Sequence, residues 1–226
     1  MAKVHPPEAF EASRSTQKRE LTMVRQLKED IDRLKKDRIV EVAEHLFFTQ
    51  GFTQTSMTQI AETLAVGKPM IYQYFSSKSA LLAEVCNRTT EFAAALADSA
   101  LEKKGSPKDR LRQIVHELSL QVMANRSGMA VLFREAQHLP EAERDRLAQN
   151  YHRFNSSLYT LLSDGVDLGE FRFASHTVVT HAISGMATWL FTWYDPEGPL
   201  SADDIAAELE ELAIKMISVC EGIEVS

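Results

Sequence analysis

The sequence contains only two cysteines, Cys86 and Cys220, which lie far apart in a chain of 226 residues. Structural zinc sites need several Cys or His residues at short, regular spacings, and neither cysteine belongs to such a set. We therefore expect two reduced thiols, and neither a disulfide nor a metal site.

The sequence also lacks long apolar runs. A helix that spans a bilayer needs roughly 18 or more apolar residues in succession, and no stretch of this chain approaches that length. The N-terminus does not show the charged and then apolar pattern of a secretory signal peptide. These absences predict a cytoplasmic protein with no membrane partner.

No arrangement of residues indicates an enzyme. The seven histidines are scattered, and His176 and His181 do not have the spacing of two metal ligands on one helix face. Serine, histidine and aspartate are common, but neither a nucleophile elbow nor a Gly-rich phosphate loop accompanies them. We expect a protein without catalytic activity and without a cofactor.

Alternating apolar and polar runs, the pattern of β-strands, are missing from Pro107 onward. Apolar residues instead recur every three or four positions between breaks rich in Gly, Pro, Asn or Ser, which predicts helices. The expected helices cover residues 38–49, 57–64, 68–74, 77–104, 107–124, 128–137, 140–163, 175–194 and 202–220. The predicted fold class is all-α.

The formal net charge of −7 would argue against a nucleic-acid partner if it were evenly spread. Up to residue 85, however, 12 Lys and Arg residues face 11 Asp and Glu residues, whereas the remainder holds 13 against 21. The acidity therefore belongs to the C-terminal part. Affinity for phosphate depends on the local surface, so charge neither identifies nor excludes DNA as a partner.

Two short helices follow each other closely between residues 53 and 82. Ser56 and Gln59 form a capping-box pattern at the start of the first helix. Gly67 suits the cap of the second, and Pro69 is tolerated there because its missing N–H falls in the first helical turn. Two short helices joined by a tight turn predict a helix-turn-helix unit, whose second helix enters the major groove of DNA.

A longer set of residues with fixed spacing includes this unit. It consists of Phe47, Gly51, Phe52, Thr55, Ser56, Ile60, Ala61, Val66, Ile71, Tyr72, Tyr74, Phe75, Ser77, Lys78, Leu81 and Leu82. With this set the chain resembles the DNA-binding domain of the TetR family of bacterial repressors. The resemblance implies a homodimer that binds a palindromic operator and responds to a small molecule held in a second helical domain. Gly67, Pro69 and Met70 depart from the residues usual in the family, so relatives' base contacts do not transfer.

The expected DNA contacts come from the second short helix and its flanks. Gln side chains can pair with adenine, Lys with guanine or phosphate, and hydroxyl groups with phosphate oxygens. By resemblance, Tyr74 and Lys78 are the expected phosphate contacts. The full candidate set is Thr55, Ser56, Lys68, Pro69, Met70, Tyr72, Gln73, Tyr74 and Lys78. For any single residue, the alternative is a solvated polar side chain.

The N-terminal segment extends beyond the usual start of the family's domain. Residues 1–18 contain a Pro pair and little periodicity, and we expect a disordered tail. From residue 19 to 36 an apolar stripe (Leu21, Val24, Leu27, Ile31, Leu34) predicts an amphipathic helix that continues into the first domain helix. This helix could pack on its own domain, bind a partner, or serve as a basic arm near phosphate. The expected divisions are 1–35, 36–82 and 83–226.

The C-terminal region is rich in aromatic residues and methionine, which suits an apolar ligand, although core packing is the alternative for each. Two segments, residues 133–140 and 193–201, resemble the ligand domain of TetR-family regulators of fatty-acid and sterol breakdown, which implies an acyl-CoA effector. Arginine suits its phosphates, and Arg134 and Arg153 are preferred over Arg126 and Arg146. The candidates are Phe92, Phe133, Arg134, Tyr151, Arg153, Phe154, His181, Met186, Trp189 and Trp193.

Two other functions fit the same sequence. A repressor of efflux genes would sense a hydrophobic drug with the same helical domain. A helical interaction protein would lack salt-dependent binding to duplex DNA.

Overall fold

The computed structural model describes residues 8–218, with side chains from residue 22 onward. In this part of the chain every regular element is a helix, as predicted. The α-helices are α1 (Glu8–Gln50), α2 (Met57–Thr63), α3 (Lys68–Tyr74), α4 (Lys78–Glu102), α5 (Pro107–Ala124), α6 (Arg126–Glu135), α7 (Glu141–Asp167), α8 (His176–Thr188), α9 (Leu190–Trp193) and α10 (Ala202–Ile217). A 3₁₀ turn at Ala136–His138 follows α6.

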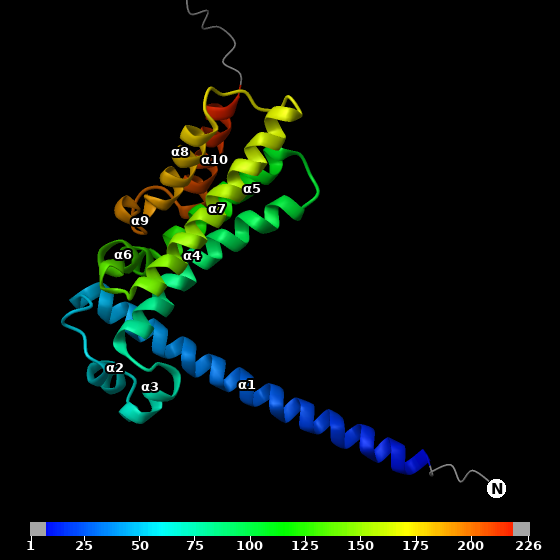
Figure 1. Ribbon diagram of the computed structural model, residues 1–226, viewed down its shortest axis with the longest axis vertical. Coiled ribbons are helices and arrows are strands. Elements are labelled where there is room, and N and C mark those ends of the chain that lie inside the picture. Colours follow the sequence, from blue (N-terminus) through cyan, green and yellow to red (C-terminus); the bar gives the residue numbers. More distant parts are fainter. Residues whose placement is uncertain (1–7, 219–226) are drawn as a thin grey trace, which may run out of the picture.

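The C-terminal part of α1 packs with α2 and α3 into the small three-helix domain predicted from the sequence (Figure 1). Its core is formed by large apolar side chains that are almost fully buried, namely Ile39, Phe47, Ile60, Ile71 and Phe75. Gly51 ends α1 with a φ of +87°, a conformation that favours glycine. The buried apolar side chains in the C-terminal part of α1 therefore form the surface on which the two short helices pack.

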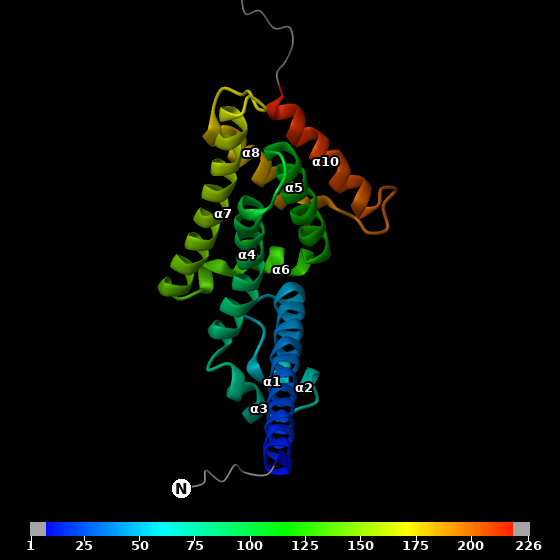
Figure 2. The same cartoon turned by 90° about the vertical axis from the view of Figure 1, so that its right-hand side faces the viewer.

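The remaining helices form a larger domain that α4 joins to the first one (Figure 2). In this domain α4 packs along α7, and α10 packs along α5. Its core includes Leu111, Ile114, Leu158, Leu161 and Ile183, all almost fully buried. Because α4 is one continuous helix across the predicted boundary at residues 82 and 83, the two domains share an element.

The first prediction to be corrected is the disordered tail at residues 1–18. The structure places residues 8–18 in α1, which runs without a break through the whole extension. The Pro pair precedes the first helical turn, and no breaker follows it until Gly51, so nothing in the sequence stops the helix. Residues 1–7 of the predicted tail lie outside the described part.

Two C-terminal helices also differ from the prediction. Helix α7 continues past residue 163 to Asp167. It ends later than predicted because the backbone turns into the left-handed conformation only at Gly169, which has a φ of +73°. The single helix predicted at 175–194 is divided at Trp189 into α8 and α9. Residues 219 and 220 of the last predicted helix lie outside the described part. Among residues 8–218, no helix has both the length and the apolar character required to cross a membrane.

Candidate DNA-binding surface and ligand cavity

The helix-turn-helix is held together by backbone and capping interactions. The Ser56 hydroxyl accepts a hydrogen bond from the Gln59 N–H at 3.2 Å, and the Gln59 side chain accepts one from the Ser56 N–H at 2.9 Å. This is the capping box expected from the sequence. Ala65 has a φ of +54° in the turn, and the Val66 N–H donates to the Ala61 carbonyl at 2.9 Å. The turn is therefore closed before α3 begins.

Helix α3 buries Ile71 and exposes Lys68, Pro69, Tyr72 and Gln73. These four were among the predicted DNA contacts, and the structure brings them to one solvent-facing surface. Such a surface, with a cation, an amide and a phenol, has the groups needed to contact base edges and phosphates.

Two further predicted contacts, Met70 and Tyr74, lie against the N-terminal extension. Met70 lines a shallow groove together with Ile31 and Leu34 of α1. The Tyr74 hydroxyl donates a hydrogen bond to the Asp32 carboxylate at 2.9 Å. Desolvation and this carboxylate raise the pKa of Tyr74. The extension therefore contacts the helix that is expected to enter the major groove.

The structure assigns Thr55 and Lys78 a role that the sequence did not indicate. Thr55 is buried, and its hydroxyl donates to the Gly51 carbonyl at 2.9 Å. The Lys78 ammonium donates to the carbonyls of Phe52 and Thr55, both at 2.7 Å, and lies 4.3 Å from the centroid of the Phe52 ring. Desolvation lowers the pKa of Lys78. In this structure these side chains hold the loop between α1 and α2 and do not present free groups to phosphate.

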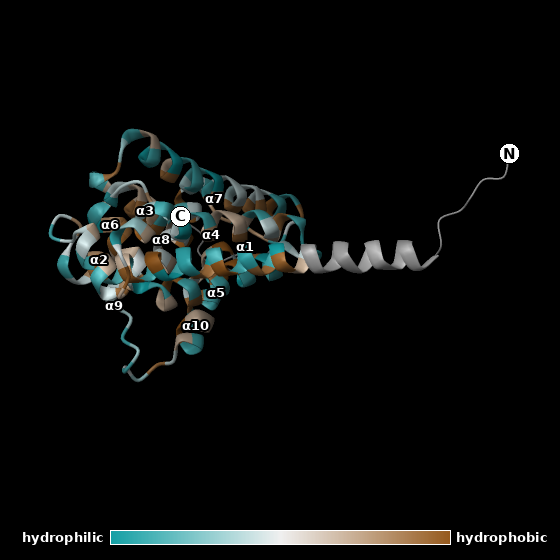
Figure 3. Ribbon diagram, turned by 90° about the horizontal axis from the view of Figure 1, so that it is seen from below, coloured by the Kyte–Doolittle hydropathy of each residue, from teal (hydrophilic) through white to brown (hydrophobic). Residues whose placement is uncertain are grey.

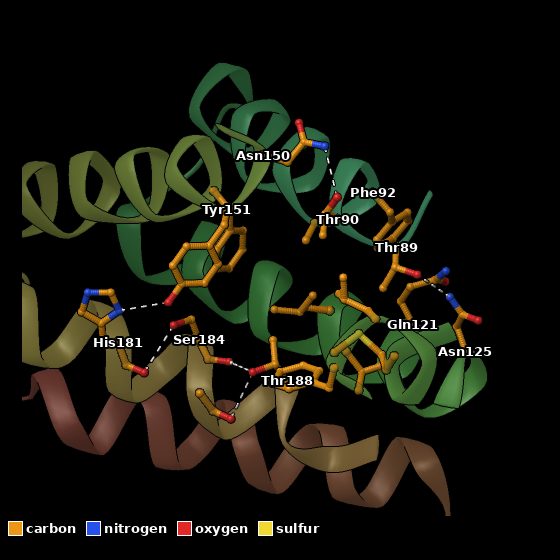
Figure 4. A pocket seen from close by; sticks show the side chains of 18 residues that line it. Thr89, Thr90, Phe92, Gln121, Asn125, Asn150, Tyr151, His181, Ser184 and Thr188 are labelled. Atoms are coloured by element: carbon orange, nitrogen blue, oxygen red, sulfur yellow. Dashed lines mark hydrogen bonds between the residues drawn. The ribbon is translucent and has the colours of Figure 1, made fainter. Parts of the chain in front are cut away.

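A cavity of about 440 Å³ lies in the larger domain between α4, α5, α6, α7 and α8 (Figure 4). Its volume falls within the range of about 300–1,000 Å³ that is usual for small-molecule sites. Its lining is mainly apolar. The lining residues are Thr89, Thr90, Phe92, Ala93, Leu118, Gln121, Val122, Asn125, Met129, Leu132, Phe133, Asn150, Tyr151, Phe154, His181, Ser184, Gly185 and Thr188.

The polar groups that line the cavity are hydroxyls, side-chain amides and the His181 imidazole, and several are paired with one another. Asn150 donates to the Thr90 hydroxyl at 3.1 Å, and the Tyr151 hydroxyl lies 3.4 Å from His181 Nδ1. Figure 4 shows Tyr151 and His181 at one end and Asn125 at the other. A ligand that enters would meet an apolar surface with hydrogen-bonding groups at both ends.

Five of the ten predicted ligand-binding residues line this cavity: Phe92, Phe133, Tyr151, Phe154 and His181. Met186, Trp189 and Trp193 do not. Both tryptophans are more than half exposed. Trp189 packs edge-on against Phe133 and Phe191, with ring centroids 6.3 and 5.8 Å apart, so it lies behind the cavity wall.

The two preferred arginines both have protein partners in this structure. Arg153 pairs with Asp98 at 2.6 Å and with Glu91 at 3.1 Å. Arg134 donates to the Phe48 carbonyl at 2.9 Å, at the end of α1. Neither lines the cavity.

Arg126 is placed differently from the other two. It follows the lining residue Asn125, and its guanidinium carbon lies 5.8 Å from the centroid of the Tyr194 ring. Its Nε is buried without a hydrogen-bond partner among the described residues. Arg126 therefore lies beside one end of the cavity with hydrogen-bonding capacity to spare.

Sequence reasoning missed the polar lining residues Thr89, Thr90, Gln121, Asn125, Asn150, Ser184 and Thr188. Polar residues in helices normally indicate a solvated face, and the sequence does not show that faces of several helices converge. One signal was available. Thr89 and Thr90 precede Phe92 in a helix whose apolar pattern they interrupt.

Two helices connect the cavity to the DNA-binding domain. Helix α4 begins at Lys78, which holds the loop after α1, and it lines the cavity at Thr89 and Thr90. Helix α6 lines the cavity at Phe133, while its neighbouring Arg134 contacts the end of α1. Both helices therefore contact the cavity and the DNA-binding domain at once.

Comparisons with known proteins agree with this architecture. Residues 104–217 match the tetracyclin repressor-like C-terminal domain, and residues 39–85 match the bacterial regulatory proteins of the tetR family. The chain is 22% identical over 191 residues to the HTH-type transcriptional repressor KstR2 of Mycolicibacterium smegmatis, covering 83% of this chain and 93% of KstR2.

Two solved structures extend the likeness. The TetR-family transcriptional regulator PfmR from Thermus thermophilus superimposes with a TM-score of 0.73 at 26% identity, covering 80% of this chain and 100% of PfmR. AibR in complex with isovaleryl coenzyme A and operator DNA has the same fold, with a TM-score of 0.69 at 23% identity and coverage of 79% and 97%. Together with the two domain matches, these findings show that the chain belongs to the tetR family of bacterial transcriptional regulators.

Proposed function

We propose that the protein is a homodimeric repressor that binds a palindromic operator through α3 and is released from it by an effector in the cavity. The observation that carries the proposal is the double role of α4 and α6, which line the cavity and also contact the DNA-binding domain. An effector changes DNA affinity only if it binds the two arrangements of these helices with different affinities.

The face of α8 that points away from the core suits the dimer contact. Val178, Ala182, Gly185 and Trp189 are all exposed and recur every three or four residues, so they share one face, although Gly185 also lines the cavity. Leu212 and Met216 of α10 are also exposed and apolar. Small residues at the centre of a helix face allow close approach, and an apolar patch of this kind indicates a protein interface.

Replacing Val178 with arginine is expected to convert the dimer to monomer at micromolar concentration, because an unpaired charge would be buried within the contact. Light scattering coupled to size exclusion measures the mass. Val166→Arg is the matched control, since Val166 is an exposed valine on α7. A Val178→Arg variant that keeps the wild-type mass would exclude this face as the interface.

We further propose that the effector is an acyl-CoA or a related lipid metabolite. The acyl group would occupy the apolar cavity, and Arg126 would bind a phosphate outside it, because a guanidinium fork suits phosphate oxygens. The AibR structure with isovaleryl coenzyme A supports this class. A neutral hydrophobic drug is the second candidate, and the observation that favours it is that no Lys, Arg, Asp or Glu is among the described residues that line the cavity.

A release experiment separates the two effectors. We expect an acyl-CoA of suitable chain length to release a labelled duplex from the region upstream of the protein's own gene, as measured by fluorescence anisotropy. Free CoA and the free acid should not release it. In Arg126→Ala the required acyl-CoA concentration should rise about tenfold, whereas in Arg146→Ala it should not change. If a neutral ester releases the duplex at the same concentration in both variants, the result would favour a hydrophobic drug as the effector.

A further inference from the structure

The N-terminal extension carries an apolar stripe that the described structure leaves substantially exposed. Val24, Leu27, Ile31 and Leu34 are between 41% and 66% exposed. Figure 3 shows hydrophobic and hydrophilic residues alternating along the coloured part of α1. Exposed apolar side chains at regular helical spacing indicate an interaction surface.

The spacing of the stripe fits two heptads of a coiled coil. Val24 and Ile31 take position a, and Leu27 and Leu34 take position d. The outer positions b, c and f hold only polar residues, namely Arg25, Gln26, Glu29, Asp32, Arg33 and Lys36. A β-branched residue at a with leucine at d is the combination that favours two parallel strands.

The charges beside the stripe complement a second copy of the same segment. Asp30 takes position g and Lys35 takes position e, and these positions face each other across a parallel pair. Within one chain Asp30 bonds Arg33 at 2.8 Å and Lys35 lies 3.9 Å from Asp32, but all four side chains remain at least 46% exposed. They are therefore accessible to a partner helix.

We propose that residues 22–35 of α1 pair with the same segment of a second molecule as a short parallel coiled coil. Where the extension meets the DNA-binding domain, Ile31 and Leu34 line a groove of about 310 Å³ with Leu64, Val66 and Met70. This groove leaves room for side chains of the second molecule. Figures 1 and 3 show α1 directed away from α8 and α9. Given the proposed α8 interface, on which this step rests, the paired molecule belongs to another dimer.

Sedimentation velocity of the full chain tests the pairing. At tens of micromolar the wild type should form tetramers. Ile31→Glu should raise the dissociation constant between tetramer and dimer by about a hundredfold, because each pair would bury two like charges. Gln26→Glu is the matched control, since it adds the same charge at an outer position and should leave the constant unchanged. Helicity by circular dichroism should be the same in all three proteins.

A charge exchange tests the register. Asp30→Lys alone and Lys35→Asp alone should each weaken the tetramer about tenfold, and the double variant should restore it. A chain that stays dimeric at every concentration, or an Ile31→Glu variant that loses only duplex affinity, overturns the proposal. If Ile31→Glu instead converts dimer to monomer, the extension pairs within one dimer. That result would overturn both the pairing between dimers and the proposed α8 interface. If only Val178→Arg converts dimer to monomer, the proposed α8 interface is supported.

Discussion

Replacing Lys78 with methionine is expected to abolish specific operator binding and to lower the free energy of unfolding by about 2–3 kcal/mol. The methionine side chain would keep the contact with the Phe52 ring, but the carbonyls of Phe52 and Thr55 would lose their charged donor. The loop between α1 and α2 would then no longer fix α2 and α3 on α1. Operator affinity should fall because the surface of α3 would be misplaced.

The comparison variant is Lys68→Met, which removes a charge from an exposed position of α3. It should weaken binding to any duplex by roughly tenfold through loss of a phosphate or base contact and leave the unfolding free energy unchanged. Denaturant titration and anisotropy on the same preparations measure both quantities. If Lys78→Met kept wild-type stability and lost affinity as Lys68→Met does, Lys78 would be the phosphate contact predicted from the sequence.

A second large effect is expected at Gly165 in α7. A Cβ added there would lie 2.0 Å from Cδ2 and 2.2 Å from Cε2 of the Phe171 ring. Phe171 is buried, so the ring cannot move into solvent without exposing the core. Alanine gains about 1 kcal/mol over glycine in a helix, but overpacking costs up to about 3 kcal/mol, so we expect a net loss of about 2 kcal/mol.

A double-mutant cycle shows whether the clash is the cause. Phe171→Leu removes the ring and should cost about 1–2 kcal/mol by itself. In the Gly165→Ala/Phe171→Leu variant the alanine should cost little or become favourable, which gives a coupling energy of at least about 1 kcal/mol. Additive losses, measured by thermal unfolding, would mean that the backbone near Gly165 relaxes without touching the ring.

The sequence predicted the DNA-binding domain in considerable detail because its signals are local. The Ser56 cap, the turn near Gly67 and the apolar spacing from Ile39 to Phe47 depend on neighbours a few residues away, and the structure confirms them. The unbroken passage of the extension into the first domain helix was also predicted and is confirmed.

The cavity was predicted only in part because it depends on contacts between distant segments. Phe92 and Phe154 were identified from their size, but Thr90 and Asn150, sixty residues apart, form a hydrogen-bonded pair that no local pattern indicates. The ion pairs of Arg153 were not predicted for the same reason. Its partners Glu91 and Asp98 are on α4, and only the packing of α7 on α4 brings them together.

The unbroken course of α1 gives the extension the properties of a rigid lever. Residues 8–36 span about 42 Å at 1.5 Å per residue, so a tilt of the DNA-binding domain by about 10° would move the far end by about 7 Å. Asp32, bonded to Tyr74, and Lys36, paired with Glu84 at 2.9 Å, fix the near end of this lever to α3 and α4. Any rotation of α3 would thus be amplified at the N-terminal end of α1, where a neighbouring molecule could sense it.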